Sequence, residues 1–127
     1  MVRTAVAIAA LVMSCSGTWA QGDAVLGEQA FERCGTCHTV GTGSKPGPDL
    51  ANVIGRPAAS LEGFKYSDAM LEAAEAGVVW DVETLTRFIT KPRSVVNGSN
   101  MAFTGFRTPD DVANVIAYLA TFSTPPQ

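Results

Sequence analysis

The chain has 127 residues, of which 46% are hydrophobic and 17% are charged, and its formal net charge is −3. This length suits a single domain, and the apolar content is too high for a disordered chain. A net negative charge argues against a basic surface that binds DNA or anionic lipid. No apolar run approaches the roughly 18 residues that span a bilayer. We therefore expect one small globular domain, in which a single histidine and three cysteines are the unusual residues.

The N-terminal segment, residues 1–20, has the layout of a secretory signal peptide. Arg3 precedes the apolar stretch AVAIAALVM, and small or polar residues follow up to Ala20. The stretch is too short for an uncleaved membrane anchor. We expect cleavage near Ala20 and a periplasmic protein; a weaker alternative is lipidation of Cys15 at a poorly matching lipoprotein box. Cleavage makes the remaining domain, residues 21–127, more acidic, because the leader contains Arg3 and no acidic residue.

The domain is expected to begin with a helix and an irregular loop. Apolar or small residues recur on one face from Ala24 to Cys34, and Asp23 can cap this helix at its N-terminus. Residues 39–48 combine glycine and proline with small polar residues, which predicts a loop. A short helical turn is expected over residues 49–54.

Two further helices are expected in the middle of the chain. Ser67 can cap a helix that runs to about Ala76, and Gly77 suits the position after its C-terminus. Asp81 precedes a stronger helical pattern, which Pro92 ends.

A second long loop, residues 93–107, is predicted before the last helix. It is rich in glycine and asparagine, shows no helical period and contains Met101. Thr108 can cap the last helix, with Pro109 at its first position and apolar residues at helical spacing after it. No segment alternates convincingly as a strand, and residues 123–127 have the composition of a flexible tail. The predicted fold class is therefore all-α.

The pentapeptide Cys34-Gly35-Thr36-Cys37-His38 is the Cys-x-x-Cys-His signature of covalent haem attachment. Each thiol can form a thioether with one haem vinyl group, and His38 can reach the iron from the same side. A thioredoxin-like pair would require a βαβ pattern around the cysteines. A structural zinc site requires four ligands, whereas the chain after residue 20 has two cysteines and one histidine. With a chance match as the remaining alternative, we expect one haem c attached through Cys34 and Cys37.

The opposite side of the haem iron needs a second ligand, and the chain has no second histidine. Met70 lies inside a predicted helix, where methionine usually fills core space. Met101 lies in the glycine-rich loop, and a loop can bring one side chain to the middle of a flat cofactor. We therefore predict His38 and Met101 as the metal ligands, with a packing role for Met101 as the alternative. Methionine ligation raises the reduction potential relative to two histidines, which suits an electron carrier.

The chain after residue 20 resembles a class I cytochrome c of the soluble bacterial and mitochondrial type. Besides the haem motif, the resemblance rests on GPDL (47–50), GR (55–56), GFKYSDA (63–69), Trp80, Leu85, Pro92, NGSNMAF (97–103) and IAYL (116–119). It implies the cytochrome c fold, in which several short helices surround one covalently attached haem. The first and last helices would cross, with Gly27 and Phe31 packed on Val115 and Tyr118.

The resemblance also implies roles around the haem. The carbonyl oxygen of Pro48 would accept a hydrogen bond from Nδ1 of His38 and fix the imidazole ring. Arg56, Tyr66 and Trp80 would hold the haem propionates, with ordinary packing or surface charge as the alternative for each. The positions that depart from the mitochondrial pattern near the axial methionine are Met70, Phe88 and Asn100.

By the same resemblance, the function is that of a one-electron carrier and not of an enzyme. It would shuttle electrons from a quinol:cytochrome c reductase to a terminal oxidase, a reaction centre or a reductase, binding these membrane complexes transiently as a monomer. Nucleic acid and stable membrane insertion are not expected. The basic residues at positions that ring the exposed haem edge in the family are Arg33, Lys45, Arg93 and Arg107, with Lys91 nearby. They form either a docking patch or a scatter of solvated charges. Two alternatives stay open for the function: a haem subunit of a larger oxidoreductase, or a haem protein whose displaceable Met101 admits peroxide or a gas.

Overall fold

A computed structural model of the chain describes residues 22–124, so the predicted signal peptide lies outside the described residues. The elements, in chain order, are α1 (Ala24–Gly35), α2 (Asp68–Glu75), α3 (Val82–Thr90), the short 3₁₀ helix η1 (Pro92–Ser94) and α4 (Pro109–Ala120). Residues 22–124 form no strand, and their only β-type pairing is an isolated bridge between Pro57 and Val79. The all-α prediction is therefore confirmed. No helix in this range is both long and apolar enough to cross a membrane.

Each α-helix begins directly after the residue that the sequence predicted as its cap. The side chains of Asp23, Ser67, Asp81 and Thr108 accept hydrogen bonds from backbone N–H groups in the first turns of α1, α2, α3 and α4. Such bonds satisfy N–H groups that have no partner within the helix. Short polar side chains therefore define where the helices start.

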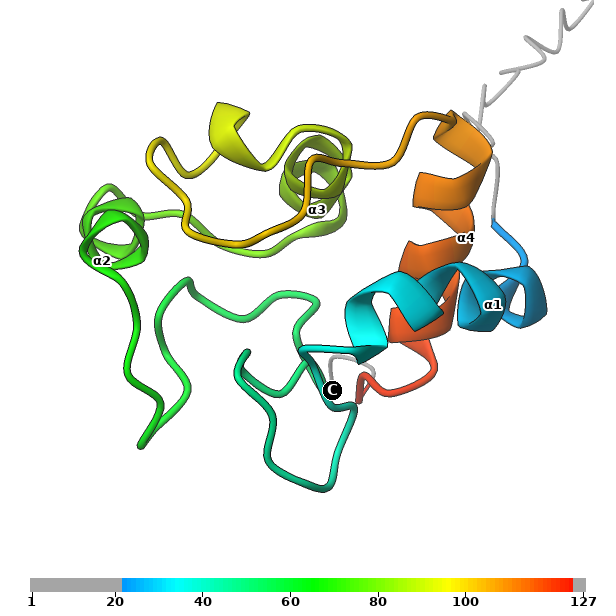
Figure 1. Cartoon of the computed structure of the whole chain (residues 1–127), viewed down its shortest axis with the longest axis horizontal. Helices are drawn as coiled ribbons and strands as arrows, with labels where there is room; N and C mark the ends of the chain where they lie inside the picture. Colours follow the sequence, from blue (N-terminus) through cyan, green and yellow to red (C-terminus); the bar gives the residue numbers. More distant parts are fainter. Residues whose placement is uncertain (1–21, 125–127) are drawn as a thin grey trace, which may run out of the picture.

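The first and last helices cross at close range, as Figure 1 shows on its right-hand side. A Cβ atom on Gly27 would lie 1.9 Å from the carbonyl oxygen of Asn114, so only glycine permits this approach. Beside it, the rings of Phe31 and Tyr118 lie with their centroids 5.2 Å apart. The N–H of Asp23 donates to Oδ1 of Asn114 at 2.7 Å. The predicted helix crossing is thus confirmed.

Residues 49–54 are not a helical turn, contrary to the sequence prediction, but a series of tight turns. Asn52 has a φ of 56°, in the left-handed region, which ends any right-handed helix at that residue. The side chain of Asn52 accepts hydrogen bonds from the N–H and hydroxyl of Thr124 at 2.9 and 3.2 Å. Thr124, which the sequence placed in a flexible tail, is thus hydrogen-bonded to the domain; residues 125–127 of that predicted tail lie outside the described residues.

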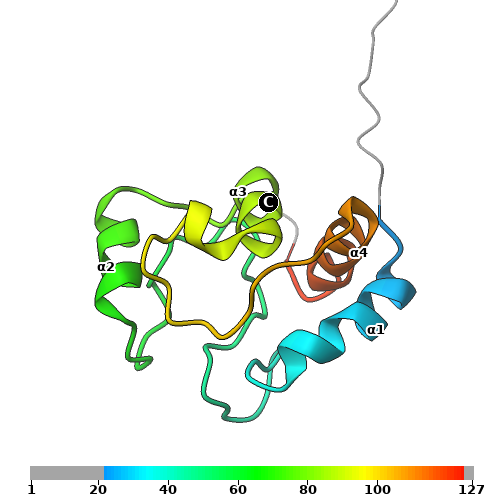
Figure 2. The same cartoon turned by 45° about the horizontal axis from the view of Figure 1, so that its top comes forward.

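The remaining segments form a ring of elements beside the α1–α4 pair (Figures 1 and 2). The irregular chain between α1 and α2 forms one side, α2 lies at the far end, and α3 with η1 forms the other side. The loop after η1 runs from the α2 end back to α4, as Figure 2 shows. The sequence had predicted an irregular loop over residues 93–107, but its first two residues, Arg93 and Ser94, belong to η1. The two long loops therefore form parts of this ring of elements, on the same side of the α1–α4 pair (Figures 1 and 2).

Candidate functional site

The Cys-x-x-Cys-His motif continues the helical turn at the end of α1. The backbone N–H groups of Cys37 and His38 both donate to the carbonyl oxygen of Cys34, at 3.0 and 2.9 Å. Cys34 is half-buried and Cys37 is exposed, and neither forms a disulfide. Burial raises the pKa of the Cys34 thiol, against the opposing charge of Arg33. Two thiols and an imidazole thus come from one short turn.

The imidazole of His38 is oriented by the following loop. Its Nδ1 atom lies 2.7 Å from the carbonyl oxygen of Pro48. A carbonyl only accepts hydrogen bonds, so the proton of the neutral ring lies on Nδ1, which leaves Nε2 free to bind a metal. The N–H of Gly47 donates to the carbonyl oxygen of Cys37 at 2.7 Å and brings the loop against the motif. The predicted Pro48 contact is present in the structure.

Gly47 lies so close to the imidazole that it has room for no side chain. A Cβ atom at this position would lie 2.6 Å from Cε1 and 2.7 Å from Nδ1 of His38. The sequence analysis did not identify this role, although the glycine-proline pair directly before Asp49 marks a place where the backbone approaches another group closely.

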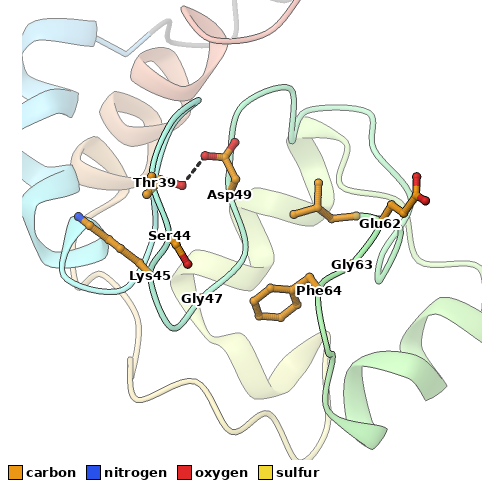
Figure 3. Close-up of a pocket in the computed structure, with 10 residues that line it drawn as sticks. Thr39, Ser44, Lys45, Gly47, Asp49, Glu62, Gly63 and Phe64 are labelled. Atoms are coloured by element: carbon orange, nitrogen blue, oxygen red, sulfur yellow. Dashed lines mark hydrogen bonds between the residues drawn. The ribbon is translucent and has the colours of Figure 1, made fainter.

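Asp49 holds the two sides of this loop together. Its carboxylate accepts hydrogen bonds from the hydroxyl of Thr39, which Figure 3 shows, and from the N–H groups of Gly41 and Ala51 at 2.7 and 2.9 Å. Burial opposes ionisation, but these hydrogen bonds and the charge of Arg56 outweigh it and lower the pKa of the Asp49 carboxyl. The carboxylate therefore fixes the backbone on which the Pro48 carbonyl lies. Sequence analysis missed this role as well.

The residues predicted to hold haem propionates lie in different surroundings. The guanidinium of Arg56 donates to the carbonyl oxygens of Asp49 and Ala51 at 2.9 and 3.2 Å, so it supports the same loop. The hydroxyl oxygen of Tyr66 accepts from the N–H of Leu61 at 3.1 Å, which leaves its own proton to donate elsewhere.

Trp80 is 7% exposed and lies against Phe88, with ring centroids 4.8 Å apart. Its ring belongs to the hydrophobic core. The backbone N–H of Trp80 donates to the carbonyl oxygen of Arg56 at 2.9 Å, so the structure brings these two residues together through their backbones.

Both candidate methionines are half-buried and pack against the core. Met70 lies in α2, whereas Met101 lies in the loop after η1. The N–H of Met101 donates to Oγ of the buried Ser99 at 3.3 Å. Burial does not separate the two residues, which differ in the element that carries them: a helix for Met70 and a loop for Met101.

A cavity of about 200 Å³ lies between the loop after the motif and the segment around Phe64 (Figure 3). Its lining includes Thr39, Lys45, Gly47 and Asp49. Neither of the two cysteines and neither of the two candidate methionines lines it. It is smaller than the roughly 300 Å³ at which sites for sizeable ligands begin. This cavity alone therefore does not make up the expected haem site.

The two other readings of the motif find no support in residues 22–124. A thioredoxin-like site would require strands, and none is present in that range. The same part of the chain has no group of three His, Cys, Asp or Glu residues that could hold a metal ion. The donor set of two thiols and one oriented imidazole instead fits a porphyrin attached at two points and ligated at its iron.

The sequence model of the Cytochrome c family matches residues 24–123. The chain belongs to the cytochrome c family. It is 47% identical to cytochrome c2 of Rhodomicrobium vannielii over 122 residues, which cover 94% of each chain. It is 42% identical to cytochrome c2 of Afifella marina over 106 residues, covering 81% of this chain and 86% of that protein.

Solved structures of cytochromes c have the same fold. Cytochrome c2 from Rhodospirillum centenum superposes with a TM-score of 0.75 at 32% identity, covering 81% of this chain and all of that one. Cytochrome cH from Methylobacterium extorquens superposes with a TM-score of 0.71 at 37% identity, covering 79% of this chain and 99% of that one. These matches confirm the predicted cytochrome c fold.

Membership of this family means that the chain carries a covalently bound haem c, through Cys34 and Cys37, and takes part in electron transport. The described residues fit that cofactor. The thiols lie on one turn, the imidazole has its Nδ1 side occupied by Pro48, and Gly47 gives the ring its space.

Proposed function

We propose that this cytochrome c is a periplasmic one-electron carrier and not an enzyme. It would consist of one domain, residues 21–127, after cleavage of the leader near Ala20. Its electrons would come from a quinol:cytochrome c reductase and pass to a terminal oxidase, a reaction centre or a reductase. The bound haem supplies an iron that alternates between the ferrous and ferric states. The chain's part is to hold that iron in an unchanging set of ligands, so that little has to move when the electron arrives.

The ligands in this proposal are Nε2 of His38 and the thioether sulfur of Met101. The 2.7 Å contact between Nδ1 of His38 and the Pro48 carbonyl is the observation that carries the proposal. It holds the ring in one orientation and one tautomer, and it makes the imidazole a better electron donor to a metal. Met101 supports the assignment because it is half-buried on a loop, and methionine favours the high potential of a carrier.

Arg56, Tyr66 and Trp80 would surround the propionates. Arg56 brings a positive charge whose position is fixed by two backbone carbonyls. The free hydroxyl proton of Tyr66 and the indole N–H of Trp80 would donate to carboxylate oxygens. These donors offset the cost of placing two negative charges beside an apolar interior.

The partners would bind through the basic residues around the haem edge. Lys91, Arg93 and Arg107 are exposed, and no described hydrogen bond or cation–π contact occupies their charged groups. Lys45 is also exposed, but its ammonium group donates to the carbonyl oxygen of Gly35 at the end of α1. A small basic patch on an acidic protein would steer encounters with acidic sites while the complexes stay short-lived.

The optical spectrum and the reduction potential of the purified holoprotein test this proposal. Low-spin ferric haem with the weak sulfur-to-iron charge-transfer band is expected for the wild type. The Met101→Ala variant should lose that band and lower the potential by about 0.1 V or more. Met70→Ala is the matched control, because it removes an equally half-buried methionine, and it should keep both properties. A high-spin wild-type spectrum with ready binding of carbon monoxide would instead identify a gas- or peroxide-reactive haem protein.

A further inference from the structure

We propose that Arg33 is a positioning residue that clamps the loop bearing Met101 onto the end of α1. The clamp would keep the methionine beside the iron and make its displacement by other ligands more difficult. This inference rests on the proposed ligation by Met101, and it adds a residue whose role is distinct from docking.

The geometry is that of one cation between two aromatic rings. The Cζ atom of Arg33 lies 5.2 Å from the ring centroid of Phe103 and 5.2 Å from that of Phe106. The two rings themselves lie edge to face, with centroids 5.1 Å apart. A guanidinium within about 6 Å of a ring centroid is attracted by the electrons of the ring face. Arg33 therefore joins α1 to two residues of the loop at once.

The backbone of the loop forms few hydrogen bonds on either side of Phe103. On the N-terminal side, the N–H of Met101 donates to Ser99 at 3.3 Å. On the C-terminal side, the N–H of Phe106 donates to the carbonyl oxygen of Ile89 at 2.9 Å. Between these points, no backbone N–H of residues 102–105 forms a hydrogen bond with another described backbone group. Phe103 lies within that span, two residues after Met101, so its contact with Arg33 restrains the part nearest the methionine.

The position of Arg33 in α1 gives the clamp its effect. The next residue, Cys34, is a point of haem attachment, so the clamp would connect the turn that holds the haem covalently to the loop that carries Met101. Arginine suits this role because its planar guanidinium can lie over aromatic faces, whereas the ammonium of lysine is a compact point charge.

Imidazole binding to the ferric holoprotein measures the strength of this clamp, because imidazole must displace Met101 to reach the iron. The apparent affinity is read from the loss of the charge-transfer band. Arg33→Gln should bind imidazole about three- to tenfold more tightly than the wild type, since two cation–π contacts are lost. Arg87→Gln is the matched control: Arg87 is also an exposed basic residue in the last turn of a helix, but its guanidinium lies over no ring among the described residues. It should bind imidazole with wild-type affinity.

Two further variants separate the clamp from a general effect of charge or folding. Arg33→Lys keeps the charge at the C-terminus of α1, and its imidazole affinity should lie between those of the wild type and Arg33→Gln. Phe103→Leu removes a ring but keeps an apolar side chain. In a protein that carries Phe103→Leu, the additional Arg33→Gln substitution should raise the imidazole affinity less than it does in the wild type. The denaturant midpoint of each holoprotein is measured alongside, because a purely structural role would lower that midpoint in proportion to the gain in imidazole affinity.

The inference is overturned if Arg33→Gln and Arg87→Gln bind imidazole alike, or if the effects of Arg33→Gln and Phe103→Leu are independent. If Arg33→Gln does not accumulate as holoprotein, Arg33→Lys with and without Phe103→Leu gives the same comparison. Absence of the charge-transfer band from the wild type would instead overturn the proposed methionine ligation, so the two failures are distinguishable.

Discussion

The Nδ1 atom of His38 lies 2.7 Å from the carbonyl oxygen of Pro48, ten residues further along the chain. Gly47, directly before Pro48, has its backbone against the same ring. One short loop therefore both orients the imidazole and limits the space around it.

Gly47→Ala should disturb the imidazole directly. Its methyl group would lie 2.6 Å from Cε1 of His38, so either the ring or the loop has to shift. We expect a loss of about 1–3 kcal/mol in unfolding free energy, the usual cost of adding a methyl group to a filled site, together with a change in the reduction potential.

Gly77→Ala is the control for this variant. Gly77 has a φ of 84° and open space around its Cβ position. Its substitution should cost about 1 kcal/mol through backbone strain and leave the potential unchanged. Equal potentials for the Gly47→Ala variant and the wild type would contradict the orienting role of the loop.

Asp49→Asn should weaken the same loop in a pH-dependent way. The folded-state pKa of Asp49 is lowered, so the ionised carboxylate stabilises the fold above its unfolded pKa of about 3.9. That contribution is lost as the pH falls through the lower, folded-state pKa. At pH 7 the variant should be less stable by about 1 kcal/mol, since hydrogen bonds to a charged acceptor are lost.

Denaturant unfolding of the holoprotein between pH 7 and pH 3 measures this difference. The difference in unfolding free energy between Asp49→Asn and the wild type should shrink as the pH falls below about 4. Glu62→Gln, at an exposed acid that lines the facing side of the Figure 3 cavity, should stay within about 0.5 kcal/mol of the wild type at pH 7. A difference between Asp49→Asn and the wild type that is constant over this pH range would count against the role of the carboxylate.

Gly27→Ala should force α1 and α4 apart. The added methyl group would lie 1.9 Å from the carbonyl oxygen of Asn114 and 2.8 Å from Cβ of Tyr118. Because the obstacle is backbone, we expect a loss of 2 kcal/mol or more, at the upper end of the range of about 1–3 kcal/mol for overpacking. Thermal unfolding checks this, with the exposed α1 substitution Gln29→Ala as a control that should change stability by less than about 0.5 kcal/mol. A Gly27→Ala variant with wild-type stability would show that the helices cross less tightly than described.

Charge reversal at Arg93 and Arg107 should slow electron transfer to a membrane redox complex. Both side chains are exposed, so their charges act through the solvent and are screened by salt. The double variant Arg93→Glu/Arg107→Glu should react about tenfold more slowly at low ionic strength, and the difference should disappear at high salt. Stopped-flow oxidation by oxidase-containing membranes measures the rate. The control is Lys65→Glu, outside the basic set, and a similar slowing by this variant would show that only net charge matters.

Much of the fold was predictable because its determinants are local. Asp23, Ser67, Asp81 and Thr108 cap the four α-helices as expected, since a cap depends on a few neighbouring residues. The haem motif was equally predictable from the sequence, because its two thiols and its imidazole fall within five residues.

The parts that were not predictable depend on contacts across the chain. The sequence predicted a helical turn over residues 49–54, but Asn52 has a left-handed backbone there. This conformation is accompanied by a hydrogen bond from Thr124, which is too far along the sequence for a local pattern to show. The hydrogen bond between Thr39 and Asp49 could not be predicted from the spacing of apolar residues either, because it closes an irregular loop. Likewise, the sequence predicted for Arg33 either a docking patch or a scatter of solvated charges, whereas its position over Phe103 requires the folded loop.

The two hydrogen bonds at the ends of the domain have a consequence for how it folds. The bond from Asp23 to Asn114 joins residues 91 apart, and the bond from Thr124 to Asn52 joins residues 72 apart. Neither can form until almost the whole chain has been made. Pairings this distant in sequence slow folding, because the entropy of closing a long loop is lost before any contact compensates it. The part of the chain from α4 to Thr124 therefore sets the time at which α1 and Asn52 acquire their partners.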